Sequence, residues 1–242
     1  MDDFSTRLAK IQNVIANAAQ RSGRDPAQIE LVAVSKTHPA EAIQEAMRAG
    51  AIHFGENKVQ EARGKIETLG RGIWHLIGHL QSNKTRDAVR LFDFIDSVDR
   101  LDLAQELNRH AETAGKTQNV LLQVNIAGES TKFGCAATAA SELAEAINAL
   151  PRLSLSGLMT IAPYSLEPEK SRPHFADLRE LRDKIQIETG LLLPVLSMGM
   201  SGDYIVAIEE GSTSVRIGTA LFGERLKLKQ RRPEDPSFIE ST

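Results

Sequence analysis

Apolar and polar residues follow two different rhythms along this chain. Short apolar runs of strand character are separated by longer segments in which apolar residues recur every three or four positions, as in amphipathic helices. The strand-like runs are 31–34, 51–54, 73–77, 94–98, 119–125, 153–159, 195–197 and 214–217. The helical segments are 4–22, 39–49, 57–69, 82–91, 100–115, 136–149, 169–189 and 202–210, and a last helix is expected after Gly218.

Strands that alternate with helices indicate a parallel sheet. A minimal unit of strand, helix and two loops needs ~24 residues, so eight units need ~190. The segment 31–225 has about that length. We therefore predict an α/β fold, a single (β/α)8 TIM-type barrel with an extra N-terminal helix, in one domain over 1–226. An open doubly wound sheet is the alternative. The charged, proline-containing segment 227–242 is expected to be a flexible C-terminal tail.

Composition narrows the class of protein. The chain has 242 residues, 41% of them hydrophobic, and a formal net charge of −3, which argues against nucleic acid or an anionic membrane as a partner. Its one cysteine, Cys135, excludes an internal disulfide and fits a reducing compartment. The acidic start at Met1 does not resemble a signal peptide, and the apolar stretch 191–200 is too short to span a bilayer. We expect a cytoplasmic monomer.

A barrel of this type carries its function at the C-terminal ends of the strands, and the loops after strands 7 and 8 commonly bind phosphate. The first of these loops contains Ser201 and Gly202 before a helical segment, and the second contains Gly218 and Thr219. Helix starts present free N–H groups, which favour anions. Asp203 would repel a phosphate, so its carboxylate is expected to face the backbone or solvent. Strand alternation directs Arg216 into the barrel mouth, where it needs an anionic or acceptor partner.

The end of the first strand carries a lysine. Lys36 has the same parity as Val32 and Val34, so it points into the mouth if those two residues line the barrel. Partial desolvation favours the neutral amine, which attacks carbonyl groups. A lysine of this kind beside a phosphate site indicates pyridoxal phosphate or a phosphorylated carbonyl substrate.

Other polar residues also stand near strand ends. Asn57, His75, His79, Gln123 and Asn125 are candidates to line the mouth. His75 and His79 are four residues apart on a strand rather than a helix, which is not a metal-site spacing, so we expect hydrogen-bonded structural histidines and no metal. Trp74 and Cys135 are expected to be packing residues.

Six segments, in order, resemble the pyridoxal phosphate homeostasis proteins. They are LVAVSKTHP (31–39), HFGENKVQEA (53–62), IWHLIGHLQSNK (73–84), GLMTIAP (157–163), LSMGMSGD (196–203) and GSTSVRIGTALFGER (211–225). The resemblance covers about residues 30–225. It implies a single-domain barrel, related in fold to the pyridoxal phosphate barrel of alanine racemases, that binds pyridoxal 5'-phosphate without established catalytic activity. It also implies a part in vitamin B6 homeostasis and amino-acid balance.

The resemblance also implies roles for particular residues. Lys36 would hold the cofactor as a Schiff base, and Arg216 would face its pyridine nitrogen. Phosphate-binding positions fall on Ser201, Gly202, Gly218 and Thr219, and Asn57 matches a residue of the mouth. The match over 125–134 is looser, because Phe133 stands where a small residue is expected.

Two alternatives remain open on the sequence. One is a pyridoxal phosphate enzyme such as a weak amino-acid racemase, and the other is a phosphate-binding aldolase or isomerase without pyridoxal phosphate. Barrel racemases take a second acid–base group, a tyrosine, from an extra C-terminal domain. This chain has Tyr164 and Tyr204 only, and too little length for that domain. We therefore favour a carrier, with pyridoxal phosphate-dependent apoenzymes as possible acceptors.

Overall fold

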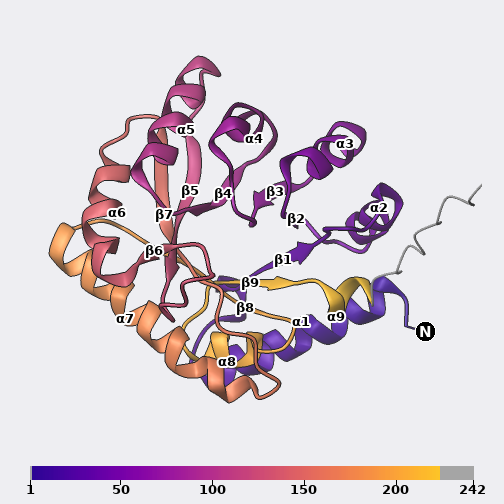
Figure 1. The fold of residues 1–242 in the computed structure, drawn as a ribbon. Coiled ribbons are helices and arrows are strands. Elements are labelled where there is room, and N and C mark those ends of the chain that lie inside the picture. The colour runs from indigo at the N-terminus through magenta and orange to yellow at the C-terminus, as the bar shows by residue number, and fades with distance from the viewer. Residues whose placement is uncertain (1, 224–242) are drawn as a thin grey trace, which may run out of the picture.

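Eight parallel strands surrounded by helices make up the protein in the computed structural model, which describes residues 2–223 (Figure 1). The hydrogen-bonded order β4-β3-β2-β1-β9-β8-β7-β5 is closed by pairing of β4 with β5. This confirms the predicted (β/α)8 barrel and excludes the open sheet. The barrel strands are β1 (Glu30–Val34), β2 (His53–Glu56), β3 (Ile73–Leu76), β4 (Phe94–Val98), β5 (Gln118–Asn125), β7 (Leu153–Met159), β8 (Val195–Met200) and β9 (Ser214–Ile217). The predicted tail 227–242 lies outside the described residues.

The helices pack around the outside of the strands (Figure 1). They are α1 (Phe4–Arg21), α2 (Ala40–Arg48), α3 (Val59–Leu69), α4 (Thr85–Leu91), α5 (Leu101–Thr113), α6 (Ala140–Asn148), α7 (Arg172–Thr189), α8 (Tyr204–Glu209) and α9 (Thr219–Phe222). Short 3₁₀ turns precede β1, α4, α6 and α7, and the last three fall almost entirely within segments predicted as helical. The two-residue strand β6 (Cys135–Ala136), which the pattern did not predict, pairs with the end of β5.

One strand begins later than the hydrophobic pattern indicates. The pattern predicts a strand over 51–54, whereas β2 covers His53–Glu56. The amide of Ala51 still donates to the carbonyl of Ala46, so Gly50 and Ala51 belong to the turn after α2. The strand then runs on to Glu56, a buried acid that hydrophobicity alone would exclude.

Strand alternation separates two layers of buried side chains. Ala33, Val215 and Ile217 belong to the core between strands and helices. Val32 and Val34 face inward, since a side chain at Gly55 on the next strand would meet both of them. The alternation of inward and outward side chains predicted for β1 and β9 is therefore correct, and it directs Arg216 to the inside of the barrel.

Helix α1 closes the outer ring. Asp3 caps it by accepting a hydrogen bond from the amide of Thr6, and its buried side includes Phe4, Leu8 and Ile15. It runs beside α8 and α9 (Figure 1). The ring of Phe222 in α9 lies 5.1 Å from Phe4 and 4.8 Å from His38, so these aromatic rings connect both terminal helices to the loop that follows β1.

Candidate ligand site at the barrel mouth

The register of four adjacent strands brings the predicted site residues to one part of the mouth. Val32 of β1 pairs with Arg216 of β9 and with His53 of β2, and Arg216 pairs in turn with Met200 of β8. In parallel strands the C-terminal ends lie at the same edge. Lys36, Asn57, Ser201, Gly202, Gly218 and Thr219 all follow the ends of these strands.

The half-buried Lys36 lies in a tight turn immediately after β1. The next residue, Thr37, has φ of 68°, a left-handed conformation that is costly for a β-branched residue. The carboxylate of Glu61 on α3 accepts a hydrogen bond from the Thr37 amide and thereby stabilises this turn. Helix α3 therefore fixes the backbone on which the lysine stands.

Behind this turn lies a buried ion-pair cluster that the sequence analysis missed. Lys65 Nζ donates to Glu56 and to Glu61, at 2.7 Å each, and to the carbonyl of Ser35 at 2.9 Å. The Ser35 hydroxyl donates to the same Glu56 oxygen at 2.6 Å. The available signal was the i,i+4 spacing of Glu61 and Lys65, which is usually a solvated helix pair.

The two acids of this cluster titrate differently. Burial raises the pKa of Glu56, although hydrogen bonds from Lys65 and Ser35 oppose the shift. Burial also acts to raise the pKa of Glu61, but hydrogen bonds from Lys65 and the Thr37 amide outweigh it, and the net shift is downward. Glu61 is thus an anion near neutral pH and a firm acceptor for the turn.

Arg216 is a buried cation whose direct hydrogen-bond partners are neutral. The residue is 3% exposed, and its guanidinium donates to the Ser197 hydroxyl at 2.6 Å and to the Thr160 carbonyl at 2.7 Å. Burial lowers its pKa, while Asp96 and Asp203 act in the opposite direction from farther away. Among residues 2–223 no carboxylate forms an ion pair with it within 4.0 Å.

The loops after β8 and β9 are joined to each other. The amide of Gly218 donates to the hydroxyl of Ser201 at 3.3 Å. Gly199 has φ of 91°, and a side chain there would collide with Ala207, so glycine permits the sharp turn into α8. Gly202 is bordered by open space, and Thr219 begins α9.

The carboxylate of Asp203 faces the backbone, as predicted. It accepts hydrogen bonds from the Met200 amide at 2.7 Å and the Ser171 hydroxyl at 3.0 Å. Because both oxygens are occupied within the protein, Asp203 shapes the loop and presents less repulsion to an anion.

The remaining predicted mouth residues divide into two groups. Asn57 lies against Gly78, where a side chain would come within 2.4 Å of the Asn57 carbonyl oxygen. Gln123 and Asn125 bind the loop 126–134 by donating to the carbonyls of Phe133 and of Glu129 and Lys132. These residues support the rim of the mouth.

His75 is a hydrogen-bonded structural histidine, as expected, but it does not line the mouth, whereas His79 lies at the rim. His79 follows β3 and its ring stacks on that of Phe133 at 3.7 Å. His75 is buried inside the barrel and contacts His53, Asp96 and Glu30. His75 lies within β3 and not after its C-terminal end, which explains why it does not reach the mouth.

Trp74 and Cys135 are packing residues, as predicted. Trp74 is buried in the helix-facing core and its ring lies 5.2 Å from Phe54. Cys135 packs against the same core, and burial raises the pKa of its thiol to about 12.

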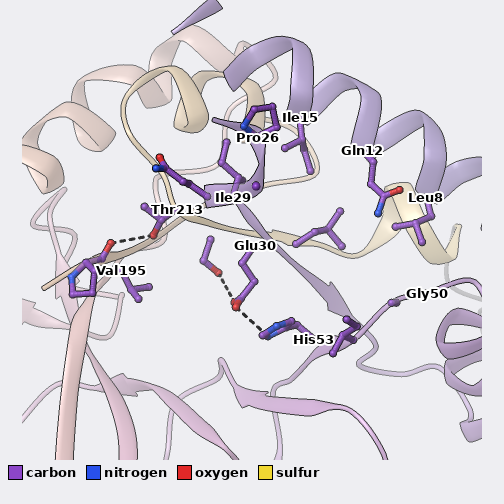
Figure 2. Close-up of a pocket in the computed structure, with 17 residues that line it drawn as sticks. Leu8, Gln12, Ile15, Pro26, Ile29, Glu30, Gly50, His53, Val195 and Thr213 are labelled. Atoms are coloured by element: carbon purple, nitrogen blue, oxygen red, sulfur yellow. Dashed lines mark hydrogen bonds and ion pairs between the residues drawn. The ribbon is translucent and has the colours of Figure 1, made fainter. Parts of the chain in front are cut away.

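A cavity of about 960 Å³ lies at the opposite, N-terminal end of the barrel (Figure 2). It is bordered by the first residues of β1, β2, β8 and β9, and Figure 2 shows Leu8, Gln12 and Ile15 of α1 along one side. None of the predicted site residues lines this cavity.

No helix within residues 2–223 combines the length and apolar character needed to cross a bilayer.

This closed barrel, with a lysine after β1 and a buried arginine on β9, belongs to a known class. The family described as "Alanine racemase, N-terminal domain" matches residues 7–226. An alanine racemase of Clostridium difficile has the same fold, with a TM-score of 0.73 at 16% identity over 91% of this chain and 56% of that chain.

Closer relatives define the family. A protein of Pseudomonas aeruginosa named "Pyridoxal phosphate homeostasis protein" is 48% identical over 227 residues, covering 93% of this chain and 97% of that protein. The solved structure of PipY from Synechococcus elongatus, with pyridoxal phosphate bound, has a TM-score of 0.81 at 40% identity over 91% of this chain and 100% of that chain. The chain belongs to the family of pyridoxal phosphate homeostasis proteins.

Proposed function

We propose that this protein binds pyridoxal 5'-phosphate at the barrel mouth, with Lys36 as the covalent attachment point, and serves vitamin B6 homeostasis. The observation that carries the proposal is the convergence of Lys36, Arg216 and the Ser201–Gly218 loops at the ends of β1, β8 and β9. The pyridoxal phosphate bound by the PipY relative supports it.

The residues at the mouth fit this ligand chemically. The ligand has an aldehyde, an aromatic nitrogen and a phosphate, which need an amine, a polar partner and an anion site. Lys36 offers the amine, and the buried guanidinium of Arg216, with neutral hydrogen-bond partners, offers the polar partner. The two joined loops, which contain Ser201, Gly202, Gly218 and Thr219, offer the anion site, and within them the Gly218 amide already donates to the Ser201 hydroxyl.

Bound pyridoxal phosphate supplies a carbonyl that amines attack and a ring that accepts electrons. Lys36 contributes its nitrogen to the carbonyl carbon, and water leaves. Arg216 opposes protonation of the ring nitrogen, since a cation disfavours a second positive charge beside it. Asn57 follows the end of β2 at the same edge of the barrel. The Glu56–Lys65–Glu61 cluster holds the turn that positions Lys36.

We also propose a carrier rather than an enzyme. A ring nitrogen kept unprotonated by Arg216 makes a weaker electron sink, which reduces what the cofactor can contribute to carbanion chemistry. Tyr204 is buried in the core and burial raises its pKa, while Tyr164 is 86% exposed. Neither has the environment of a racemase acid–base group. Exchange of the α-hydrogen of amino acids for deuterium tests this, and rapid Lys36-dependent exchange would contradict it.

Titration with pyridoxal phosphate, followed by visible absorbance and gel filtration, tests the binding proposal. The native protein is expected to retain one equivalent as a yellow complex. Lys36→Arg preserves the positive charge but should lose the colour, because guanidinium does not condense with the aldehyde. Lys58→Ala is the matched control, since Lys58 is an exposed lysine beside Asn57. Equal colour in the native protein and Lys36→Arg would contradict the assignment.

Pyridoxal phosphate-dependent apoenzymes are the proposed acceptors. A reversible covalent bond is suited to release. Mixing the loaded protein with an inactive apoenzyme should restore activity faster than the same amount of cofactor dissociating alone. Equal rates would show that acceptors take the free cofactor.

A further inference from the structure

Two histidines and a glutamate converge inside the lower half of the barrel, away from the mouth. His53 Nδ1 lies 3.0 Å from His75 Nε2 and 3.1 Å from Glu30 Oε2, and His75 Nε2 lies 3.7 Å from Glu30 Oε1. One ligand atom from each residue therefore lies within 4.8 Å of the others. Figure 2 shows Glu30 directed toward His53 at the wall of the cavity.

We propose that Glu30, His53 and His75 form a binding site for a divalent transition-metal ion of the zinc class. Two imidazole nitrogens and one carboxylate are an established three-ligand set for zinc, with a fourth position left for water. In a tetrahedral site with bonds of ~2.0–2.1 Å, ligand atoms stand ~3.4 Å apart. The separations between the ligand atoms of Glu30, His53 and His75, which are 3.0, 3.1 and 3.7 Å, lie on either side of ~3.4 Å.

The surrounding residues orient these ligands as metal sites require. The other ring nitrogen of His75, Nδ1, is 3.3 Å from both carboxylate oxygens of the buried Asp96. A carboxylate behind a histidine ligand fixes the ring and directs the free nitrogen toward the metal. The Ser214 hydroxyl donates to Glu30 Oε1 at 3.3 Å, which steadies the third ligand.

The cavity gives this site an entrance. Glu30 and His53 border the cavity of about 960 Å³, whereas His75 is enclosed behind them with 4% of its side chain exposed. An ion can thus enter from the N-terminal end of the barrel, and its open position faces the cavity. The site is separate from the mouth, because Glu30 and His53 are the first residues of their strands and the mouth lies at the opposite ends.

This cluster leaves no motif in the sequence, because its three residues are far apart in the chain. Glu30, His53 and His75 come from three successive strands, β1, β2 and β3. Parallel pairing places Val32 beside His53 and Gly55 beside His75, and this register gathers the three residues. A hydrogen-bonded cluster without a metal is the competing interpretation.

The test is titration of untagged, chelator-treated protein with Zn²⁺ alone, using a competing chromophoric chelator, and with Co²⁺ as a spectroscopic probe. One equivalent is expected, with the intense visible absorption of four-coordinate Co²⁺. Glu30→Gln and His53→Gln should weaken binding by more than tenfold, and Asp96→Asn by roughly 10–100-fold. His174→Ala, which removes a histidine of α7 outside the cluster, is the matched control.

Two further measurements distinguish the loss of metal binding from the unfolding of a variant. Circular dichroism must show a native barrel, and Zn²⁺ should raise the Tm of the native protein but not that of Glu30→Gln. X-ray absorption of the Zn²⁺-loaded native protein should show two imidazole ligands and oxygen ligands. Absence of stoichiometric binding, binding that survives both ligand variants, or a different ligand set would overturn the proposal.

Discussion

At the residue scale, the most consequential side chain besides Lys36 is Lys65. Its ammonium group joins Glu56, Glu61 and the Ser35 carbonyl in a nearly water-free position next to the Lys36 turn. A buried ion pair is weak evidence for stability in itself, but removing one partner leaves an uncompensated charge. Lys65 is therefore a positioning residue whose loss affects both stability and the turn.

Lys65→Met should lower the free energy of unfolding by about 3–5 kcal/mol, because Glu56 stays buried without its cation. Urea denaturation at neutral pH measures this. The double variant Lys65→Met with Glu56→Gln should regain much of the loss, since no buried charge remains. A single variant that costs less than about 1 kcal/mol would show that the cluster is not buried in solution.

Cys135 provides a second prediction at this scale. Burial, and secondarily the charge of Asp99, raises the pKa of its thiol to about 12. The reactive thiolate is therefore scarce at neutral pH and increases as the pH approaches that value. At pH 8 a disulfide reagent should react on the order of a thousandfold more slowly with the native protein than with the same protein in urea. Equal rates would contradict the burial of this thiol.

At the scale of elements, the hydrophobic pattern predicted the strand and helix order because each strand alternates with an amphipathic helix. It could not predict β6, since two residues carry no periodic signal, and it placed β2 two residues early. It predicted the inward direction of Arg216 because the alternation of side chains along one strand is a local property. It missed Lys65 and the Glu30–His53–His75 cluster because these depend on pairing between separate elements.

Glycines test the packing of elements directly. A side chain at Gly157 of β7 would lie 1.9 Å from the Val195 carbonyl oxygen of β8, so Gly157→Ala must push the strands apart. We expect a loss of at least ~1–3 kcal/mol. Gly64 in the middle of α3 has open space around it, and Gly64→Ala should stabilise by about 0.5–1 kcal/mol. Thermal denaturation compares the two variants, and equal effects would refute this packing.

At the scale of the whole molecule, ion pairs connect helices from the two ends of the chain. Arg172 of α7 donates to Glu209 at the end of α8 and to the next residue, Glu210, at 2.7 and 2.9 Å, and Arg21 of α1 also donates to Glu209 at 2.9 Å. Hydrogen bonds from Arg172 and then Arg21 lower the pKa of Glu209. Burial opposes the shift at Glu210, but its arginine partners lower that pKa as well.

The pH dependence of stability follows from these shifts. A carboxyl group whose pKa is lower in the folded state stabilises it above the unfolded pKa of ~4.3, and this stabilisation is lost as pH falls through the folded pKa. Arg172→Met should therefore cost about 1 kcal/mol at pH 7 and progressively less below pH ~4. Arg90→Met, which removes an exposed pair with Glu67, should cost little at any pH. A cost for Arg172→Met that does not change with pH would exclude the ionic explanation.

The barrel thus separates the two proposed sites, the ligand site at the mouth on β8, β9, β1 and β2 and the Glu30–His53–His75 cluster on β1, β2 and β3. Such separation predicts that Glu30→Gln leaves pyridoxal phosphate binding at Lys36 unchanged.

The most direct test of the central claim is borohydride reduction of the protein loaded with pyridoxal phosphate, followed by tryptic peptide mapping. The label is predicted on Lys36, in an uncut peptide spanning 25–48. A label on any other lysine, with Lys36 cleaved normally, would contradict the account.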